Sequence, residues 1–273
     1  MPTQTSVLKI AGAKQMKNRI YFFTGTGNSL KASKDIAGVI GECELVPIKK
    51  DMDMAVPNGY ERIGFIFPVY YWGPPAMVVD FLRNAKFAPQ GDTYYFAIAT
   101  FGALPGVAPS IVRDILKEHN ITLNYGGGVK MFANGVYNYN MSKRVEKITR
   151  RGNARIATIV PAIVSKTSNK IRTTKPFMME QYQKKVGDLK NLALDFNVND
   201  SCIKCGLCRD ICPANNITLD DGVIFGTNCG SCLACIQRCP QKAINHTSKT
   251  IERRRYQHPQ ISNDELLSYY KED

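Results

Sequence analysis

Eight of the nine cysteines lie between residues 202 and 239, in two runs of the same form. The runs read CIKCGLCRDICP (202–213) and CGSCLACIQRCP (229–240), so both have the spacing C-x2-C-x2-C-x3-C-P. Their first cysteines are 27 residues apart (229 − 202), which indicates an internal duplication. Thiolates with this spacing are ligands of [4Fe–4S] clusters, which move one electron at a time. The first chemistry that the sequence indicates is therefore electron transfer.

The spacing also predicts which cysteines share a cluster. Three closely spaced thiolates surround one cubane, and the fourth cysteine of each run completes the cluster of the other run. The first cluster is expected on Cys202, Cys205, Cys208 and Cys239. The second is expected on Cys229, Cys232, Cys235 and Cys212. Structural zinc typically uses separated C-x2-C pairs, and disulfides need an oxidising compartment, so both alternatives are weak. Cys43 lies in an apolar context, GECELVPI, and is expected to be a buried core thiol.

A second candidate site follows the apolar stretch RIYFF (19–23), where the loop TGTGNS (24–29) leads into a helical pattern. Counted from Gly25, a Walker loop would need Gly at the sixth position and then Lys, but that position is Leu30. Leu30 also replaces the third glycine of a dinucleotide-binding fingerprint, although Glu44 stands roughly where a ribose-binding acid belongs. A helix N-cap turn without a ligand remains as the simple alternative.

The loop resembles the phosphate loop of flavodoxins, T-x-T-G-N-[TS], which also follows a strand directly. The resemblance implies an FMN phosphate bound by backbone N–H groups at a helix N-terminus and by hydroxyl groups, without a lysine. Its glycines allow a close approach of the backbone, and Asn tolerates the left-handed region. The implied phosphate-binding residues are Thr24, Gly25, Thr26, Gly27, Asn28 and Ser29.

Two later loops are expected to complete a flavin site, because ligands of this fold bind at the carboxyl ends of the strands. The strands ERIGFIF (61–67) and TYYFAIAT (93–100) lead into the loops PVYYWGPP (68–75) and FGALPG (101–106). Flavodoxins place aromatic side chains in these loops, where they stack on the flavin ring. For any single aromatic residue, ordinary packing is an equal alternative. The expected flavin contacts are Pro68, Tyr70, Tyr71, Trp72, Gly73, Thr100, Phe101 and Gly102.

The elements that must position these loops alternate as in a doubly wound α/β fold. Strands are predicted at 19–24, 43–48, 62–67, 93–100 and 127–133, and helices near 29–40, 75–85 and 106–119. This order predicts a flavodoxin-like sheet of five parallel strands, followed by a small α+β domain for the two clusters.

The predicted organisation has four parts: a flavodoxin-like FMN-binding domain (18–142), a basic helical connector (143–196), a two-cluster ferredoxin-like domain (197–246) and a tail (247–273). In the connector, six apolar side chains spaced like one helix face are expected to pack on a domain: Met178, Met179, Tyr182, Val186, Leu189 and Leu192. The tail is expected to end in a short helix, NDELLSYY, lying on the surface. The three histidines, His119, His246 and His258, lie outside the flavin loops, and surface or capping roles are expected for them.

The net charge is +13, and residues 143–190 contribute thirteen Lys and Arg against three Asp and Glu. Such a stripe could meet an acidic protein, anionic lipid or nucleic acid, or be a solvated face. No base-reading motif accompanies it, which disfavours nucleic acid. The apolar window 63–82 contains three prolines, so no membrane span is expected there. Lys9 interrupts any apolar core in the N-terminal residues, so no signal peptide is expected. We therefore expect a cytoplasmic protein.

The chain as a whole resembles the flavodoxin–ferredoxin fusion proteins of anaerobic microbes. The resemblance rests on TGTGNS, FPVYYWGPP, ATFGALPG and the paired cysteine runs, and covers roughly residues 18–246. It implies FMN and two [4Fe–4S] clusters, an electron-transfer role and a redox protein partner of unknown identity. Two alternatives remain: an FMN-dependent reductase of a small electron acceptor, and a non-catalytic iron–sulfur binding or sensing protein.

Overall fold

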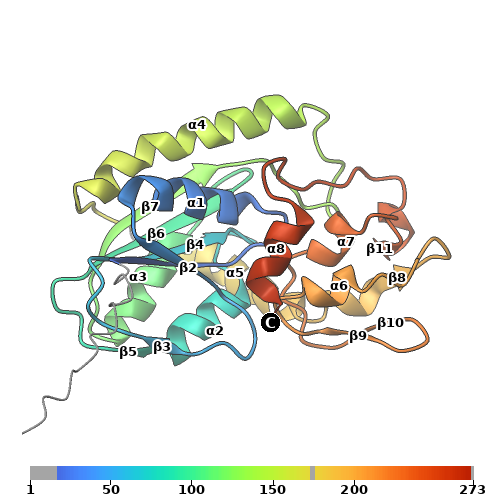
Figure 1. Ribbon diagram of the computed structural model, residues 1–273, viewed down its shortest axis with the longest axis horizontal. Helices are drawn as coiled ribbons and strands as arrows, with labels where there is room; N and C mark the ends of the chain where they lie inside the picture. Colours follow the sequence, from blue (N-terminus) through green and yellow to red (C-terminus); the bar gives the residue numbers. More distant parts are fainter. Residues whose placement is uncertain (1–16, 173–175, 272–273) are drawn as a thin grey trace, which may run out of the picture.

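A five-stranded parallel sheet organises the first half of the chain (Figure 1). The computed structural model describes residues 17–172 and 176–271. The sheet strands are β1 (Asn18–Phe22), β2 (Cys43–Pro47), β4 (Arg62–Pro68), β6 (Tyr94–Phe101) and β7 (Leu123–Lys130). They lie in the order β2-β1-β4-β6-β7, and every neighbouring pair is parallel. This is the strand order of the flavodoxin-like fold, so the predicted fold class is confirmed.

The last strand differs from its prediction, because β7 begins at Leu123 and not near 127. Its sequence, LNYGGGVK, contains three consecutive glycines, which have no side chains to produce a strand-like apolar pattern. Pairing with β6 over Tyr95–Phe101 defines the strand instead. A Cβ atom on Gly128 would lie 2.8 Å from the Phe101 ring, so close side-chain packing requires glycine there.

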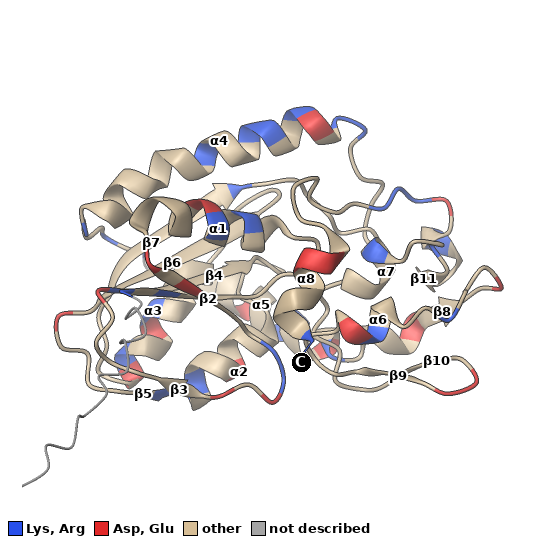
Figure 2. Cartoon of the chain, in the orientation of Figure 1, with Lys and Arg blue, Asp and Glu red and all other residues tan. Residues whose placement is uncertain are grey.

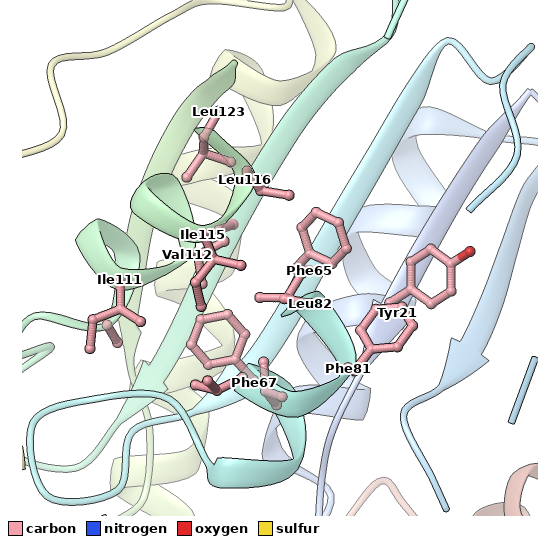
Figure 3. Packing of buried hydrophobic residues seen from close by; sticks show 14 of the residues in the cluster. Tyr21, Phe65, Phe67, Phe81, Leu82, Ile111, Val112, Ile115, Leu116 and Leu123 are labelled. Atoms are coloured by element: carbon pink, nitrogen blue, oxygen red, sulfur yellow. The ribbon is translucent and has the colours of Figure 1, made fainter. Parts of the chain in front are cut away.

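Helices cover both faces of the sheet (Figure 1). One face packs against α1 (Asn28–Ile40) and α4 (Val145–Val164), and the other against α2 (Ala76–Asn84) and α3 (Ala108–Glu118). Figure 3 shows Phe65 and Phe67 of β4 packed among the side chains of α2 and α3. The opposite face buries Phe22 and Phe96, and burial of apolar side chains on both faces is the main favourable contribution to the stability of such a layered fold.

The basic segment that follows β7 contributes two helices to this layered structure. The apolar residues Ile156, Val160 and Ile163 of α4 are buried against the sheet. The Lys and Arg residues of α4 lie on its outer side (Figure 2). Helix α5 (Pro176–Leu189) packs Tyr182 into the opposite core layer, with Met178, Met179 and Val186 beside it, as predicted for this apolar face. Leu192 lies beyond the end of α5 and packs with the cysteine-rich unit instead. Within residues 17–172 and 176–271, no helix is long and apolar enough to cross a membrane.

The second half forms a smaller unit around the cysteines. Strand β8 (Phe196–Val198) pairs antiparallel with β11 (Ile244–His246), and β9 (Ile217–Leu219) pairs with β10 (Val223–Phe225). Helix α6 (Leu207–Asp210) and helix α7 (Ala234–Arg238) lie within the two cysteine runs. Four further short elements are β3 (Ala55–Val56), β5 (Lys86–Phe87), η1 (Leu192–Asp195) and η2 (Ser248–Thr250).

The C-terminal segment folds back onto the protein, as expected, but some of its side chains are buried more deeply than a surface position implies. Helix α8 (Asn263–Tyr270) lies between the sheet and the cysteine-rich unit (Figure 1). Tyr256, His258 and Leu266 are fully or almost fully buried. His258 therefore has an interior position, not the surface or capping role that we expected. The segment contains many polar residues and only a few apolar ones, so its sequence pattern alone could not predict this burial.

Candidate functional site

A cavity of about 630 Å³ lies at the carboxyl ends of β1, β4 and β6. Twelve of the fourteen residues predicted to contact a flavin line it, and only Gly27 and Gly73 do not. Its volume is in the range of small-molecule and cofactor sites. No Asp, Glu, His, Lys or Arg of the described chain is among its lining residues. The cavity is thus a neutral space between the three loops that the sequence predicted.

The phosphate-type loop is fixed by hydrogen bonds within the protein. Gly27 is the N-cap of α1 with φ of 100°, and its N–H donates to Thr24 Oγ1 at 3.1 Å. The Asn28 amide donates to Phe132 O at 3.0 Å and accepts from the Tyr256 hydroxyl at 2.8 Å. The first N–H groups of a helix have no partner inside it. The start of α1 therefore offers backbone donors to an anion, in a loop whose shape is already set.

The residues after β7 form a wall of the cavity that was not predicted from the sequence. Asn134 Nδ2 donates to Thr26 Oγ1 at 2.5 Å, and the Tyr137 hydroxyl donates to that of Tyr71 at 3.2 Å. Asn138 and Tyr139 also line the cavity. Ligands of this fold bind at the carboxyl ends of the strands. This rule predicted the loops after β4 and β6, and it could also have predicted this segment, which follows β7.

The loop after β4 contains a strained turn. Tyr70 and Gly73 exchange backbone hydrogen bonds of 2.9 and 3.0 Å, which closes a two-residue turn around Tyr71 and Trp72. These two residues have φ of 44° and 79°, in a region that large side chains rarely adopt. Such strain persists only where surrounding structure imposes it, and it is typical of ligand-binding sites. The turn directs two aromatic residues to the cavity wall.

Helix α5 and the start of α3 hold this turn in place. The Tyr182 hydroxyl donates to Pro74 O at 2.8 Å, and its ring occupies the space beside Gly73, where a Cβ atom would lie 2.4 Å from it. On the other side, Val107 N–H donates to Trp72 O at 2.6 Å. Gly73 thus has a packing role in the structure, and Tyr182 is a supporting residue outside the predicted site.

The first predicted set of cysteines comes together around one pocket, which is closed by Leu219, Val223 and Ile244. Its four cysteines are Cys202, Cys205, Cys208 and Cys239. Burial, together with the neighbouring thiols, raises the pKa of Cys208 to about 11. Cys239 Sγ accepts a hydrogen bond from Ala243 N–H at 3.3 Å. An apolar pocket with four convergent sulfur atoms suits a [4Fe–4S] cluster, because iron stabilises the thiolates that burial disfavours.

The second predicted set lies deeper, beside the cavity. Burial raises the pKa of Cys235 far above its ordinary value, and the nearby thiols of Cys232, Cys229 and Cys212 contribute to the shift. Cys229 Sγ accepts from Ser231 N–H at 3.3 Å, and Cys212 Sγ accepts from Asn216 N–H at 3.4 Å. Cys212 and Cys239 are the fourth cysteines of the two runs, and the Sγ atom of each accepts a hydrogen bond from the backbone N–H four residues later.

Among the described residues, no three His, Cys, Asp or Glu side chains are placed to hold a single metal ion. A cubane differs from such an ion, since each thiolate binds a different iron and the sulfur atoms stand farther apart. Cys43, at the edge of the sheet, is half-buried and packs on the core, and burial raises its pKa to about 12.

The two sites share a boundary. Ser231, Cys232 and Leu233 line the cavity together with the phosphate-type loop. A Cβ atom on Gly25 would lie 2.0 Å from Cys232 O and 3.0 Å from Cys232 Cβ. The backbone of the phosphate-type loop and that of the second cysteine run are therefore in direct contact, which only glycine permits at position 25.

Comparisons with known proteins agree with the cysteine-rich unit. The family model described as "4Fe-4S binding domain" matches residues 198–218. A segment of 54 residues is 35% identical to the polyferredoxin protein MvhB of Methanothermus fervidus, and it covers 19% of this chain and 13% of that protein.

Solved structures that match about half of the chain do so at low sequence identity. The two-electron reduced flavodoxin of Megasphaera elsdenii is 14% identical, with a TM-score of 0.35, over 52% of this chain and 98% of the flavodoxin. The rubredoxin oxygen:oxidoreductase of Desulfovibrio gigas is 15% identical, with a TM-score of 0.35, over 56% of this chain and 37% of that protein. The fold assignment rests on the strand order of the chain itself.

Proposed function

We propose that this chain, a fusion of a flavodoxin-like domain with a 4Fe–4S-binding ferredoxin-like domain, transfers electrons between FMN in the cavity and two [4Fe–4S] clusters. The observation that carries the proposal is the shared cavity wall. Residues of all three predicted flavin loops line the same space as Ser231, Cys232 and Leu233. A flavin bound there would be adjacent to a ligand of the second cluster, with no other domain between them.

When bound, FMN exchanges electrons singly or in pairs, and each cluster exchanges one at a time. The chain's own part is to bind and orient these groups. The start of α1 would hold the phosphate, and the turn with Tyr71 and Trp72 would position the ring. Backbone N–H groups directed at Cys229 and Cys212 would stabilise the thiolates and tune the potential of the second cluster.

The first cluster site is the more accessible of the two. Cys205 is exposed, and the neighbouring Ile203 is 61% exposed. The second site contains the buried Cys235 and borders the cavity. This arrangement supports a route in which an external redox protein exchanges electrons at the first cluster, and the second cluster connects it to the flavin.

The neutral lining of the cavity supports electron exchange over acid–base chemistry on a substrate. A proton-transferring group in an active site is usually His, Asp, Glu, Lys, Tyr or Cys. Of these, only tyrosines and Cys232 line the cavity in the described chain, and burial raises the pKa of Tyr70 far above its ordinary value. We therefore rank the carrier role above a reductase role.

The first experiment is purification without oxygen and measurement of iron, acid-labile sulfide and FMN per chain. Two clusters and one flavin predict about eight iron atoms and one FMN. Eight iron atoms without flavin, even after incubation with FMN, would contradict the flavin half of the proposal. About four iron atoms in fully loaded protein would contradict the second cluster.

The coupling itself needs a kinetic test. One-electron reduction by a light flash, followed at cluster and flavin wavelengths, should show a transfer phase whose rate does not depend on protein concentration. A phase that accelerates in proportion to concentration would mean that electrons pass between molecules. That result would refute the internal route.

A further inference from the structure

Arg238 is a buried arginine that connects the two units. It directly precedes Cys239 in the second cysteine run and is only 2% exposed. Its side chain extends to the phosphate-type loop, where Nε donates to Gly25 O at 2.9 Å. The guanidinium group therefore lies behind the loop whose N–H groups would bind the FMN phosphate.

The duplication shows that the cluster fold does not require an arginine at this position. With the offset of 27 residues, Arg238 corresponds to Ile211 in the first run (238 − 27 = 211). Ile211 is also fully buried, and it packs in the apolar cluster that includes the residues of α1. Two equivalent buried positions thus hold an isoleucine and an arginine, so the charge serves a need specific to the second copy.

Among the described residues Arg238 forms no ion pair, although Glu265 and the Cys232 thiol are near enough to act on its charge. The hydrogen bonds of Arg238 go to neutral acceptors, which are Gly25 O, Gln257 Oε1, Ile261 O, Ser262 O and Asn263 Oδ1. Nη2 is buried and makes no hydrogen bond. An arginine guanidinium group is protonated at neutral pH, so the buried group carries its charge. A buried charge without a hydrogen-bonded anion is costly, which indicates that an anion belongs nearby.

The free Nη2 atom is directed at the start of α1. A Cβ atom on Gly27, the N-cap residue, would lie 3.0 Å from Nη2. The helix N-terminus and the guanidinium group therefore add their positive potentials at the same loop. The helix alone offers partial charge, whereas Arg238 adds a full one.

We propose that Arg238 is a positioning residue of the flavin site, which supplies the positive charge for the FMN phosphate from within the cluster-binding unit. The inference rests on the proposed function, since it requires FMN in the cavity. It explains how a loop without lysine can bind a phosphate dianion at a buried position. It also makes tight binding of FMN depend on a folded cluster-binding unit.

The competing explanation is that Arg238 balances the negative charge of the thiolate-bound clusters. The test separates the two by comparing FMN with riboflavin, which has the same ring system and no phosphate. Dissociation constants for both are measured by titration of flavin-free protein that retains its clusters. Wild-type protein should bind FMN more tightly than riboflavin.

We expect Arg238→Gln and Arg238→Met to weaken FMN binding roughly 10- to 100-fold and leave riboflavin binding unchanged. Arg238→Lys, which retains the charge, should keep most of the preference for FMN. Arg155→Gln is the matched control, because it removes the same charge from an exposed position on α4 and should change neither constant. Iron content reports that each variant is folded. If the uncharged variants lose their clusters, the comparison of FMN and riboflavin binding by Arg238→Lys decides whether the charge is the cause of the FMN preference.

Three outcomes would overturn the inference. Equal weakening of FMN and riboflavin would mean that Arg238 only supports the structure. Unchanged FMN binding with a lowered reduction potential of a cluster would assign the charge to the cluster. Loss of the FMN preference in Arg238→Lys, as complete as in Arg238→Met, would show that charge is not the cause. Wild-type protein that binds neither flavin would instead refute the proposed function itself.

Discussion

Replacement of Gly25 by alanine should disturb the direct backbone contact between the phosphate-type loop and the second cysteine run. The new Cβ atom would lie 2.0 Å from Cys232 O, and an ordinary contact begins at 3.4 Å, so the overlap is 1.4 Å (3.4 − 2.0). Both partners are backbone, which cannot turn aside as a flexible side chain does. We expect a cost near the upper end for overpacking, about 3 kcal/mol. This corresponds to a melting temperature lower by roughly 6 to 12 °C.

The same strain should appear in flavin binding. If the phosphate-type loop moves to relieve the overlap, up to about 3 kcal/mol is lost from FMN binding, which is roughly a 100-fold weaker affinity. The assay is anaerobic thermal unfolding together with FMN titration of the cluster-loaded protein. Flash reduction of the same samples should show slower transfer between cluster and flavin.

Gly38→Ala provides the matched control in helix α1. A Cβ atom there would have no neighbour within 4 Å, and glycine inside a helix costs about 0.5 to 1 kcal/mol relative to alanine. This variant should therefore be slightly more stable than wild type, with unchanged FMN affinity. If Gly25→Ala also matched or exceeded the wild type in melting temperature and FMN affinity, the direct contact between the two loops would be refuted.

Three further predictions address the pH response, the clusters and the turn. Burial lowers the pKa of His258 from its ordinary 6.5 to about 4, so the unfolded chain binds a proton first as the pH falls. The stability from neutral His258 is complete above pH 6.5 and is lost towards pH 4. Between pH 7.5 and 5, wild type should lose about 2 kcal/mol more than His258→Gln in anaerobic unfolding, and equal losses would contradict the assignment. Cys232→Ser should reduce iron from about eight to about four atoms per chain, whereas Cys43→Ser should retain all of it; full iron in the first variant would remove Cys232 from the ligand set. Tyr182→Phe loses a buried hydrogen bond to Pro74 O worth about 1 kcal/mol and should weaken FMN binding several-fold with iron unchanged; unchanged affinity would show that the turn does not need this support.

The parts of the molecule that the sequence predicted well depend on local patterns. The cysteine spacing of each run sets the reach of a short loop, and it predicted the two groups of thiols that come together. The loop from Thr24 to Ser29 follows a buried strand and begins a helix. Its position at the carboxyl ends of the strands therefore followed from the predicted order of the elements. These features need only residues that are near in the chain, or the topology of a known fold class.

The parts that could not be predicted depend on contacts between distant residues. Asn134 and Thr26 are 108 positions apart, Arg238 and Gly25 are 213 apart, and Tyr270 and Thr24 are 246 apart. In the sequence, nothing in the local pattern around Asn134, Arg238 or Tyr270 indicates that these side chains reach the phosphate-type loop. The left-handed conformation of Trp72 is equally hidden, because tertiary packing imposes it against the local preference of the residue.

The burial of the C-terminal segment has a consequence for how the protein is made. Tyr256 and His258 hydrogen-bond the loop between Thr24 and Asn28, and the Tyr270 hydroxyl donates to Thr24 O at 2.9 Å. Ribosomes make the N-terminal part first, so this loop leaves the ribosome more than 200 residues before its partners. The phosphate-type loop therefore reaches its final shape only after helix α8 has been translated and has folded against it.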